Sequence, residues 1–171
     1  MTTTPSDNSF AFRLLPHLEI EHISGFLEAL LERGGEESLS TAARRLFLTV
    51  DELIPILEAI KLLGFGRVSE AIICVTDLGR VFADTTIPGR RWLFRQQVLE
   101  NIPQIAFMTS ALQHAHDFEE EADYFLEKFK EGFPGIEAEQ QFAVAVEWGR
   151  YAELFEYDAD TKRLHLLPIN A

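Results

Sequence analysis

The side chains that could bind a metal ion are densest at residues 114–121. His114, His116 and Asp117 precede a run of three glutamates, from Glu119 to Glu121. Two histidines two residues apart can hold the same zinc, iron or manganese ion only in an extended segment, where the glutamates could complete the site. A loop followed by an acidic helix start explains the run more simply, because the positive end of a helix attracts carboxylates. We therefore assign no metal ligand.

Nucleophiles and general bases are equally scarce. Cys74 is the single cysteine and lies in the apolar run Ile72-Ile73-Cys74-Val75, where burial would raise the pKa of the thiol and leave it inert. The remaining histidines, His17, His22 and His165, are isolated in sequence. No carboxylate spacing marks a general acid and base. These residues predict no catalytic site.

Nucleotide-binding loops are also missing from the sequence. Neither Gly-x-x-x-x-Gly-Lys-Ser/Thr nor Gly-x-Gly-x-x-Gly occurs, so the backbone amides and the lysine that would hold phosphates are lacking. A dinucleotide-binding fold would further need alternating strands and helices, which the pattern does not have. The sequence predicts a protein that is not an enzyme and that uses no cofactor.

Basic residues beside a tryptophan are the main candidate for an interaction surface. Arginines next to tryptophan can contact nucleic acid or a protein partner, although arginine stems also pack over buried tryptophans. Both interpretations stay open for Trp92, whereas Gly149 beside Trp148 favours a core position for that tryptophan. The candidate interaction patch, called the arginine patch below, comprises Arg80, Arg90, Arg91, Trp92 and Arg95.

Hydrophobic periodicity predicts a mainly α protein with small β-hairpins, an α+β chain. In the first half, Thr49 and Glu52 form a capping box at the start of a helix, and Thr76 is the N-cap of another whose Val81 faces inward. Pro55 is close enough to the first turn to be tolerated. The expected elements are helices at 20–33, 38–46 and 50–63, a hairpin at 65–75 turning at Ser69-Glu70, and a helix from Asp77.

The second half repeats this order of three helices and a hairpin. A long helix, bent near Pro103, would span residues 88–114. Further helices at 118–131 and 136–154 and a hairpin at 155–166 would follow it. We interpret the chain as two winged-helix-like units joined by the long helix. Residues 1–18 form a disordered or extended lead-in, residues 19–86 the first unit, and residues 87–171 the linking helix and the second unit.

Charge disfavours nucleic acid as the partner. The net charge is −13, which repels phosphates unless basic residues gather on one face. The third helix of a winged helix usually enters the major groove, but here residues 50–63 and 136–155 are both predominantly acidic. No apolar run is long enough for a membrane span. The N-terminus lacks a signal peptide, and a lone cysteine suits a reducing cytoplasm.

Several motifs resemble a known family. They are Leu27-Glu-Ala-Leu-Leu-Glu-Arg-Gly-Gly35, Asp51-Glu-Leu-Ile-Pro-Ile-Leu-Glu-Ala59, Leu62-Leu-Gly-Phe65, Val75-Thr-Asp-Leu-Gly-Arg-Val-Phe-Ala83 and Trp148-Gly-Arg-Tyr-Ala-Glu-Leu-Phe-Glu-Tyr-Asp158. Together they resemble the AAA-associated C-terminal domain, which is fused behind the ATPase subunit of nitrate/sulfonate/bicarbonate-type ABC transporters. The resemblance implies an accessory role beside a transport ATPase and transfers no catalytic residue. The sequence begins at a methionine without an ATPase ahead, so the chain is either a free-standing relative or a fragment of a fusion.

Three hypotheses follow from the sequence. The leading one is a non-catalytic accessory or regulatory module in the cytoplasm that binds an ABC-type ATPase subunit. The alternative is a winged-helix transcriptional regulator, a homodimer through the helix from Pro88, that uses the arginine patch to bind DNA. The third is a metal-dependent enzyme using His114 and His116.

Overall fold

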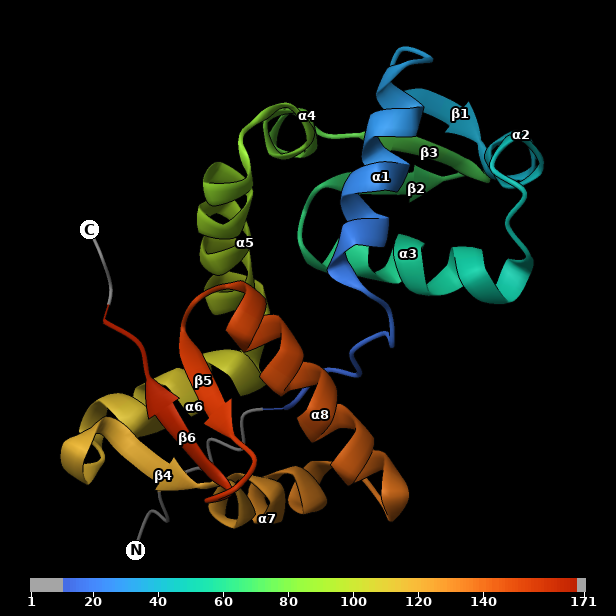
Figure 1. Ribbon diagram of the computed structural model, residues 1–171. Coiled ribbons are helices and arrows are strands. Elements are labelled where there is room, and N and C mark those ends of the chain that lie inside the picture. The colour runs from blue at the N-terminus through green and yellow to red at the C-terminus, as the bar shows by residue number, and fades with distance from the viewer. Residues whose placement is uncertain (1–10, 169–171) are drawn as a thin grey trace, which may run out of the picture.

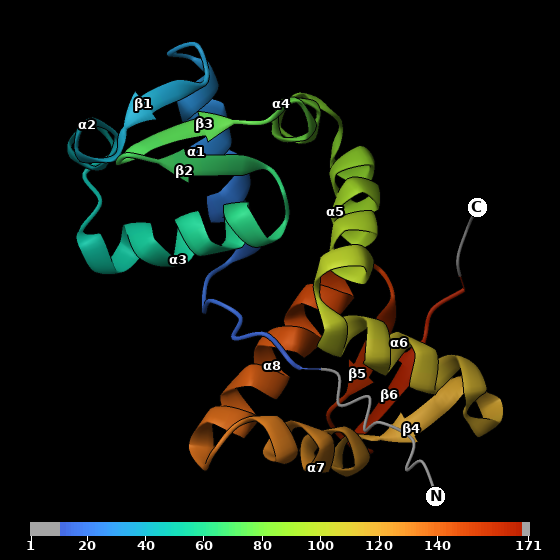
Figure 2. The same cartoon turned by 180° about the vertical axis from the view of Figure 1, so that it is seen from behind.

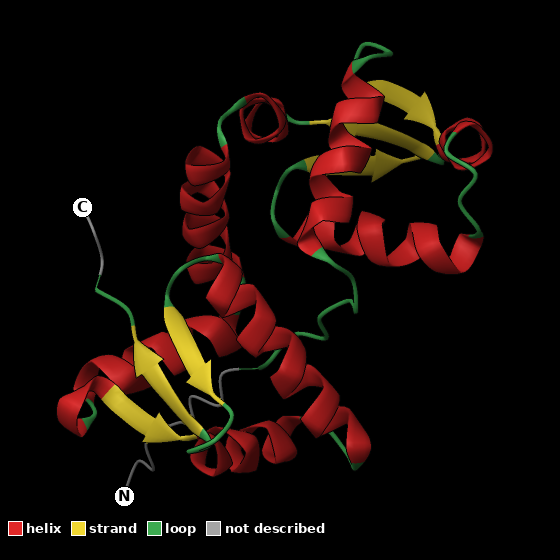
Figure 3. Cartoon of the chain, in the orientation of Figure 1, coloured by secondary structure: helices red, strands yellow, loops and turns green. Residues whose placement is uncertain are grey.

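The computed structural model describes residues 11–168, in which eight α-helices surround two small antiparallel sheets (Figure 3). The prediction of a mainly α chain with small β-hairpins is therefore confirmed. The first unit contains α1 (Ile20–Leu31), β1 (Glu36–Ser38), α2 (Leu39–Arg45), α3 (Val50–Leu62), β2 (Gly66–Ser69), β3 (Ile72–Val75) and α4 (Asp77–Asp84). Its sheet has the order β1-β3-β2.

The second unit has the same order of elements. After the linking helix α5 (Ile87–Asn101), it contains α6 (Pro103–His114), the 3-10 turn η1 (His116–Phe118), β4 (Glu119–Glu121), α7 (Ala122–Gly132), α8 (Ile136–Tyr151), β5 (Phe155–Asp158) and β6 (Arg163–Leu166). The sheet order β4-β6-β5 repeats that of the first unit. Figure 1 shows the two units as separate lobes, with α5 running from one to the other.

The repetition extends to individual backbone hydrogen bonds. After α3, the Phe65 amide donates to the Ile60 carbonyl. After α8, the Leu154 amide donates in the same way to the Gly149 carbonyl. Likewise, the Leu39 amide at the start of α2 donates to the carbonyl of Ala71, in the hairpin turn between β2 and β3. At the start of α7, the Ala122 amide donates to the Lys162 carbonyl in the second hairpin turn. The two units are therefore copies of one supersecondary arrangement.

A third strand in each sheet differs from the sequence prediction. β1 pairs with β3, and β4 pairs with β6, so that Glu119 lies opposite His165. The glutamates at 119–121 thus form a strand, and the prediction that they begin a helix is wrong. The first hairpin also turns at Glu70 and Ala71, which both have positive φ, one residue later than predicted.

The long helix predicted at 88–114 is two helices. Ile102 has extended backbone angles, φ −115° and ψ 93°, because the ring of Pro103 disfavours helical geometry in the residue before it. α5 links the units, and α6 is the first helix of the second unit. The proline therefore breaks the helix instead of bending it.

The caps and the core follow the sequence more closely. Thr49 and Glu52 form the predicted capping box, and the Thr76 hydroxyl accepts from the Gly79 amide at the start of α4. Phe65 and Phe82 are fully buried and stacked with ring centroids 4.3 Å apart. Val81, predicted to face inward, is exposed instead.

Trp148 lies in the core of the second unit, as predicted. Its neighbour Gly149 permits close approach of the β5 strand, because a Cβ atom there would lie 2.1 Å from the ring of Phe155. Phe94 of α5 packs edge-on against Trp148, with centroids 5.6 Å apart. The linking helix is therefore part of the second hydrophobic core.

Candidate functional site

The arginine patch lies on α4 and α5, and its guanidinium groups are used to hold the protein together. Arg90 donates to the carbonyl oxygens of Phe82 and Ala83, near the end of α4, and pairs with Glu28 of α1. Arg80 donates to the Gly34 carbonyl, 3.1 Å away, in the turn after α1. Arg80 therefore fastens α4 to the turn after α1, and Arg90 fastens α5 to the first unit.

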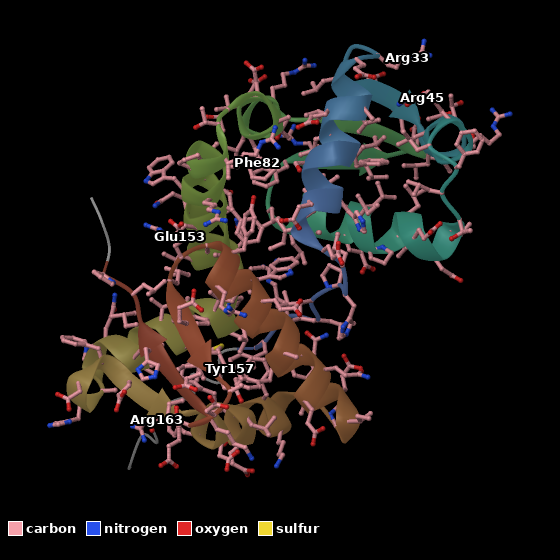
Figure 4. The ribbon with its side chains drawn as sticks, viewed as in Figure 1. Arg33, Arg45, Phe82, Glu153, Tyr157 and Arg163 are labelled. Atoms are coloured by element: carbon pink, nitrogen blue, oxygen red, sulfur yellow. The ribbon has the colours of Figure 1, made fainter. Side chains whose placement is uncertain are left out.

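Arg91 and Arg95 hold α5 to the second unit. Both contact the carboxylate of Glu153, just beyond the end of α8, with N–O distances of 2.9 and 3.2 Å. Arg95 is only 9% exposed and also donates to the Ala152 carbonyl. Figure 4 shows Glu153 beside α5. Because this one carboxylate pairs with both cations, Arg91 and Arg95 form a structural junction between α5 and the second unit.

Glu153 occupies a strained backbone position. Its φ is +55°, in the left-handed region that favours glycine, and the corresponding residue after α3 is Gly64, with φ +73°. A side chain with a Cβ in this region costs about 1 kcal/mol. The second unit therefore tolerates strain at the site where the first unit has glycine, and it thereby presents the carboxylate that binds both arginines.

Trp92 is the aromatic member of the arginine patch, and it lies at the protein surface. Its side chain is 55% exposed, which settles the sequence ambiguity in favour of a surface position. It borders an open groove of about 460 Å³. The groove is lined by both arginines and glutamates, and Arg150 and Glu156 form an ion pair 2.8 Å long. This surface is amphipathic and nearly neutral, unlike the cationic surface that phosphate binding requires.

The outer face of α3 carries an apolar strip that the sequence analysis did not single out. Phe47 is 93% exposed in the turn before the helix, and Val50 and Ile54 are exposed one helical turn apart. The acidic residues Asp51 and Glu58 are exposed on the same helix. The sequence does contain a signal, because Val50 and Ile54 fall outside the buried stripe of α3. We call Phe47, Val50 and Ile54 the α3 strip.

An open groove lies on the other side of α3, toward α1. Its volume is about 600 Å³, and its floor includes Phe26, Leu48 and Ile56. Glu19 and Glu21 border it from the beginning of α1. Pro55 of α3 also lines this groove, in the second turn of the helix. The third helix of the first unit thus exposes apolar and acidic groups where a DNA-binding winged helix would need donors to bases and phosphates.

The histidines and acidic residues at 114–121, which the sequence analysis weighed as metal ligands and did not assign, are not brought together. His114 contacts the carbonyl of Ser110 on its own helix, and His116, which is almost fully exposed, pairs with Asp117. Glu119 instead contacts Arg163 and His165 of β6. Within residues 11–168, no three His, Cys, Asp or Glu side chains lie close enough to hold a metal ion.

Cys74 is partly exposed, so its prediction as a buried thiol is wrong. Its Sγ donates to a carboxylate oxygen of Glu36, 3.0 Å away on the neighbouring strand. This hydrogen bond raises the pKa of the Cys74 thiol, with smaller contributions from desolvation and from the Glu36 charge. Low reactivity of the thiol is therefore expected from its hydrogen bond to Glu36 and not from burial in the core.

These features define a class of protein: a duplicated, mainly α module with an apolar and acidic exposed helix face. The sequence matches the family described as the C-terminal AAA-associated domain over residues 41–158, and the chain belongs to this family. No curated protein matches the chain, and no solved structure does. In the part of the chain that the structure describes, no helix is both long and apolar enough to cross a membrane.

Proposed function

We propose that this chain is a non-catalytic, cytoplasmic accessory module that binds the ATPase subunit of an ABC-type transporter and regulates it. The family to which the chain belongs supports an association with such an ATPase. Under this proposal the chain contributes binding energy and position, and the ATP-hydrolysing residues belong to the partner.

The α3 strip is the observation that carries the proposal. Large exposed apolar side chains that lie close together mark protein interfaces more often than they mark ordinary surface. Phe47 is the most exposed of the large apolar side chains in residues 11–168. Aromatic side chains of this kind supply much of the binding energy at protein interfaces.

Charge favours a protein partner over DNA at the same surface. A winged-helix-like unit that bound DNA through α3 would bring Asp51 and Glu58 against the phosphates. Three arginines of the arginine patch, Arg90, Arg91 and Arg95, are already paired with carboxylates within the protein. The exposed acidic residues instead suit a basic surface on the partner. We therefore rank the DNA-binding regulator below the accessory module.

Co-purification with matched variants tests this proposal. The tagged chain is recovered from the source cells after mild cross-linking, and the retained proteins are identified by mass spectrometry. The test variant is Val50→Asp/Ile54→Asp. The control is Ile136→Asp, which introduces one such charge at a 72% exposed residue at the start of α8; each single variant, Val50→Asp and Ile54→Asp, is compared with it as the charge-matched pair. We expect an ABC-type ATPase subunit with the wild-type chain and the control, and its loss with the test variant. Equal recovery with all three chains, or no ATPase subunit with any, would refute the proposal.

A further inference from the structure

Residues 12–16 precede the first unit in sequence but lie on the second unit. They have no regular secondary structure and, in Figure 2, run from the start of α1 across α8 toward α6. Leu15 is 1% exposed and Pro16 is also buried. The lead-in predicted at residues 1–18 therefore includes an extended segment that is bound to the second unit. Residues 1–10 of it lie outside the described part of the chain. We call residues 12–16 the strap.

Two buried glutamines bind the backbone of the strap. Gln104 of α6 and Gln141 of α8 are both fully buried. The amide of Arg13 donates to Gln104 Oε1, and Gln104 Nε2 donates back to the Arg13 carbonyl. Gln141 makes the same pair of bonds with Leu15, at 2.8 and 2.9 Å. Residues two apart in an extended chain present their N–H and C=O groups to the same side, so the two glutamines act like a neighbouring strand.

The side chains of the strap enter an apolar site. The ring of Phe12 lies 5.9 Å from that of Phe107 and 5.0 Å from that of Phe129, measured between centroids. Leu15, three residues later, is buried, whereas Leu14 between them is 65% exposed. The site therefore combines main-chain recognition by two amides with apolar contacts for two side chains, the pattern by which proteins bind extended peptides.

Hydrophobic packing alone would not place two glutamines in this core. A buried amide without partners is costly, because it loses its hydrogen bonds to water. Here each amide oxygen accepts from, and each amide nitrogen donates to, one residue of a segment 91 or 126 positions away in sequence. Gln141 Nε2 donates in addition to Glu137 on its own helix. Both glutamines lie within the stretch that matches the family, residues 41–158, and the strap lies outside it. The site is thus built by the second unit, and the strap fills it.

We infer that α6, α7 and α8 form a peptide-binding site that the strap occupies as an intramolecular ligand. The site accepts in trans an extended segment with a large aromatic residue followed, three positions later, by leucine. This inference is independent of the proposed ATPase partner and of the α3 strip. A tethered ligand competes at a high effective concentration. An added peptide therefore binds strongly only when the strap is released.

Fluorescence anisotropy with a labelled peptide of residues 11–18 tests the inference. The full-length chain is used as wild type, as Leu15→Asp, whose charge cannot remain buried at the site, and as the matched control Leu14→Asp at the exposed neighbour. Circular dichroism and thermal unfolding verify that each variant is folded. If Leu15→Asp does not fold, Leu15→Ala, which retains a small apolar side chain, takes its place.

We expect saturable binding to the Leu15 variant and at least about tenfold weaker apparent binding to the wild type and to Leu14→Asp. A peptide with alanine in place of both Phe12 and Leu15 should bind at least roughly 100-fold more weakly than the parent, as expected for the loss of two buried apolar side chains. A folded Leu15 variant that does not bind the peptide would overturn the inference. So would equal binding to all three chains, or equal binding of the two peptides.

Discussion

Replacement of Glu153 measures how firmly the arginine patch joins the two units. Glu153→Ala removes the carboxylate that contacts Arg91 and Arg95 and keeps a Cβ at φ +55°. Glu153→Gly also removes the carboxylate but relieves the backbone strain. Comparing the two variants with the wild type therefore separates the ion pairs from the cost of the left-handed conformation.

The expected magnitudes follow from exposure. The Arg91 pair is about as exposed as a surface salt bridge and contributes roughly 0.2–1 kcal/mol, with 42% and 46% exposure of its side chains. The Arg95 pair involves an arginine side chain that is only 10% exposed, and we assign it about 1 kcal/mol. Glu153→Ala should thus lower the free energy of unfolding by about 1–2 kcal/mol. Glu153→Gly should lower it by about 1 kcal/mol less, because glycine adopts this φ freely.

Urea denaturation, monitored by tryptophan fluorescence, gives these differences at constant m-value. Glu156→Ala is the control, because it removes an ion pair with Arg150 whose two side chains are about half exposed. That variant should change the free energy by no more than about 0.5 kcal/mol. An unfolding free energy of Glu153→Ala equal to that of the wild type would refute the structural role of the arginine patch.

Three further predictions test other parts of the structure. Duplex DNA should not bind the chain even at low salt, where anisotropy would detect a non-specific complex; binding that persists near physiological salt would restore the regulator hypothesis. Glu36→Gln should lower the pKa of the Cys74 thiol and speed its reaction with a disulfide reagent near neutral pH, because a neutral amide accepts the thiol hydrogen bond more weakly than the carboxylate and does not repel the thiolate; an unchanged rate would contradict this cause. Gly149→Ala should lower the free energy of unfolding by about 1–3 kcal/mol through its clash with a buried ring. Gly25→Ala, where the added Cβ meets nothing within 4 Å, should raise the free energy of unfolding by about 0.5–1 kcal/mol. Equal changes in the two variants would contradict close packing at Gly149.

The helices and hairpins could be predicted because their signals are local. The buried stripe of α3 and the capping box at Thr49 lie within a single helix, and both are present in the structure. The strands β1 and β4 could not be predicted, since each has three polar residues and pairs with a strand about 40 positions later. Pro103 predicts a disturbance of the helix, but the tertiary packing decides that the helix is broken.

The functional surfaces depended on contacts that the sequence does not reveal. Arg90 and Arg95 donate to carbonyl oxygens at helix ends, and no side-chain pattern in the sequence indicates such partners. Gln104 and Gln141 are unremarkable helical residues until the fold brings residues 12–16 against them. The α3 strip could have been recognised, because Val50 and Ile54 are apolar residues outside the buried stripe.

Hydrogen–deuterium exchange tests the central claim most directly, namely that the chain binds an ATPase subunit through α3. The exchange of the full chain is measured alone and with the ATPase subunit identified by co-purification. We predict slower exchange in α3 and in the turn that contains Phe47, and unchanged exchange in α5. Protection centred on α5 around Trp92, with α3 unaffected, would contradict the account.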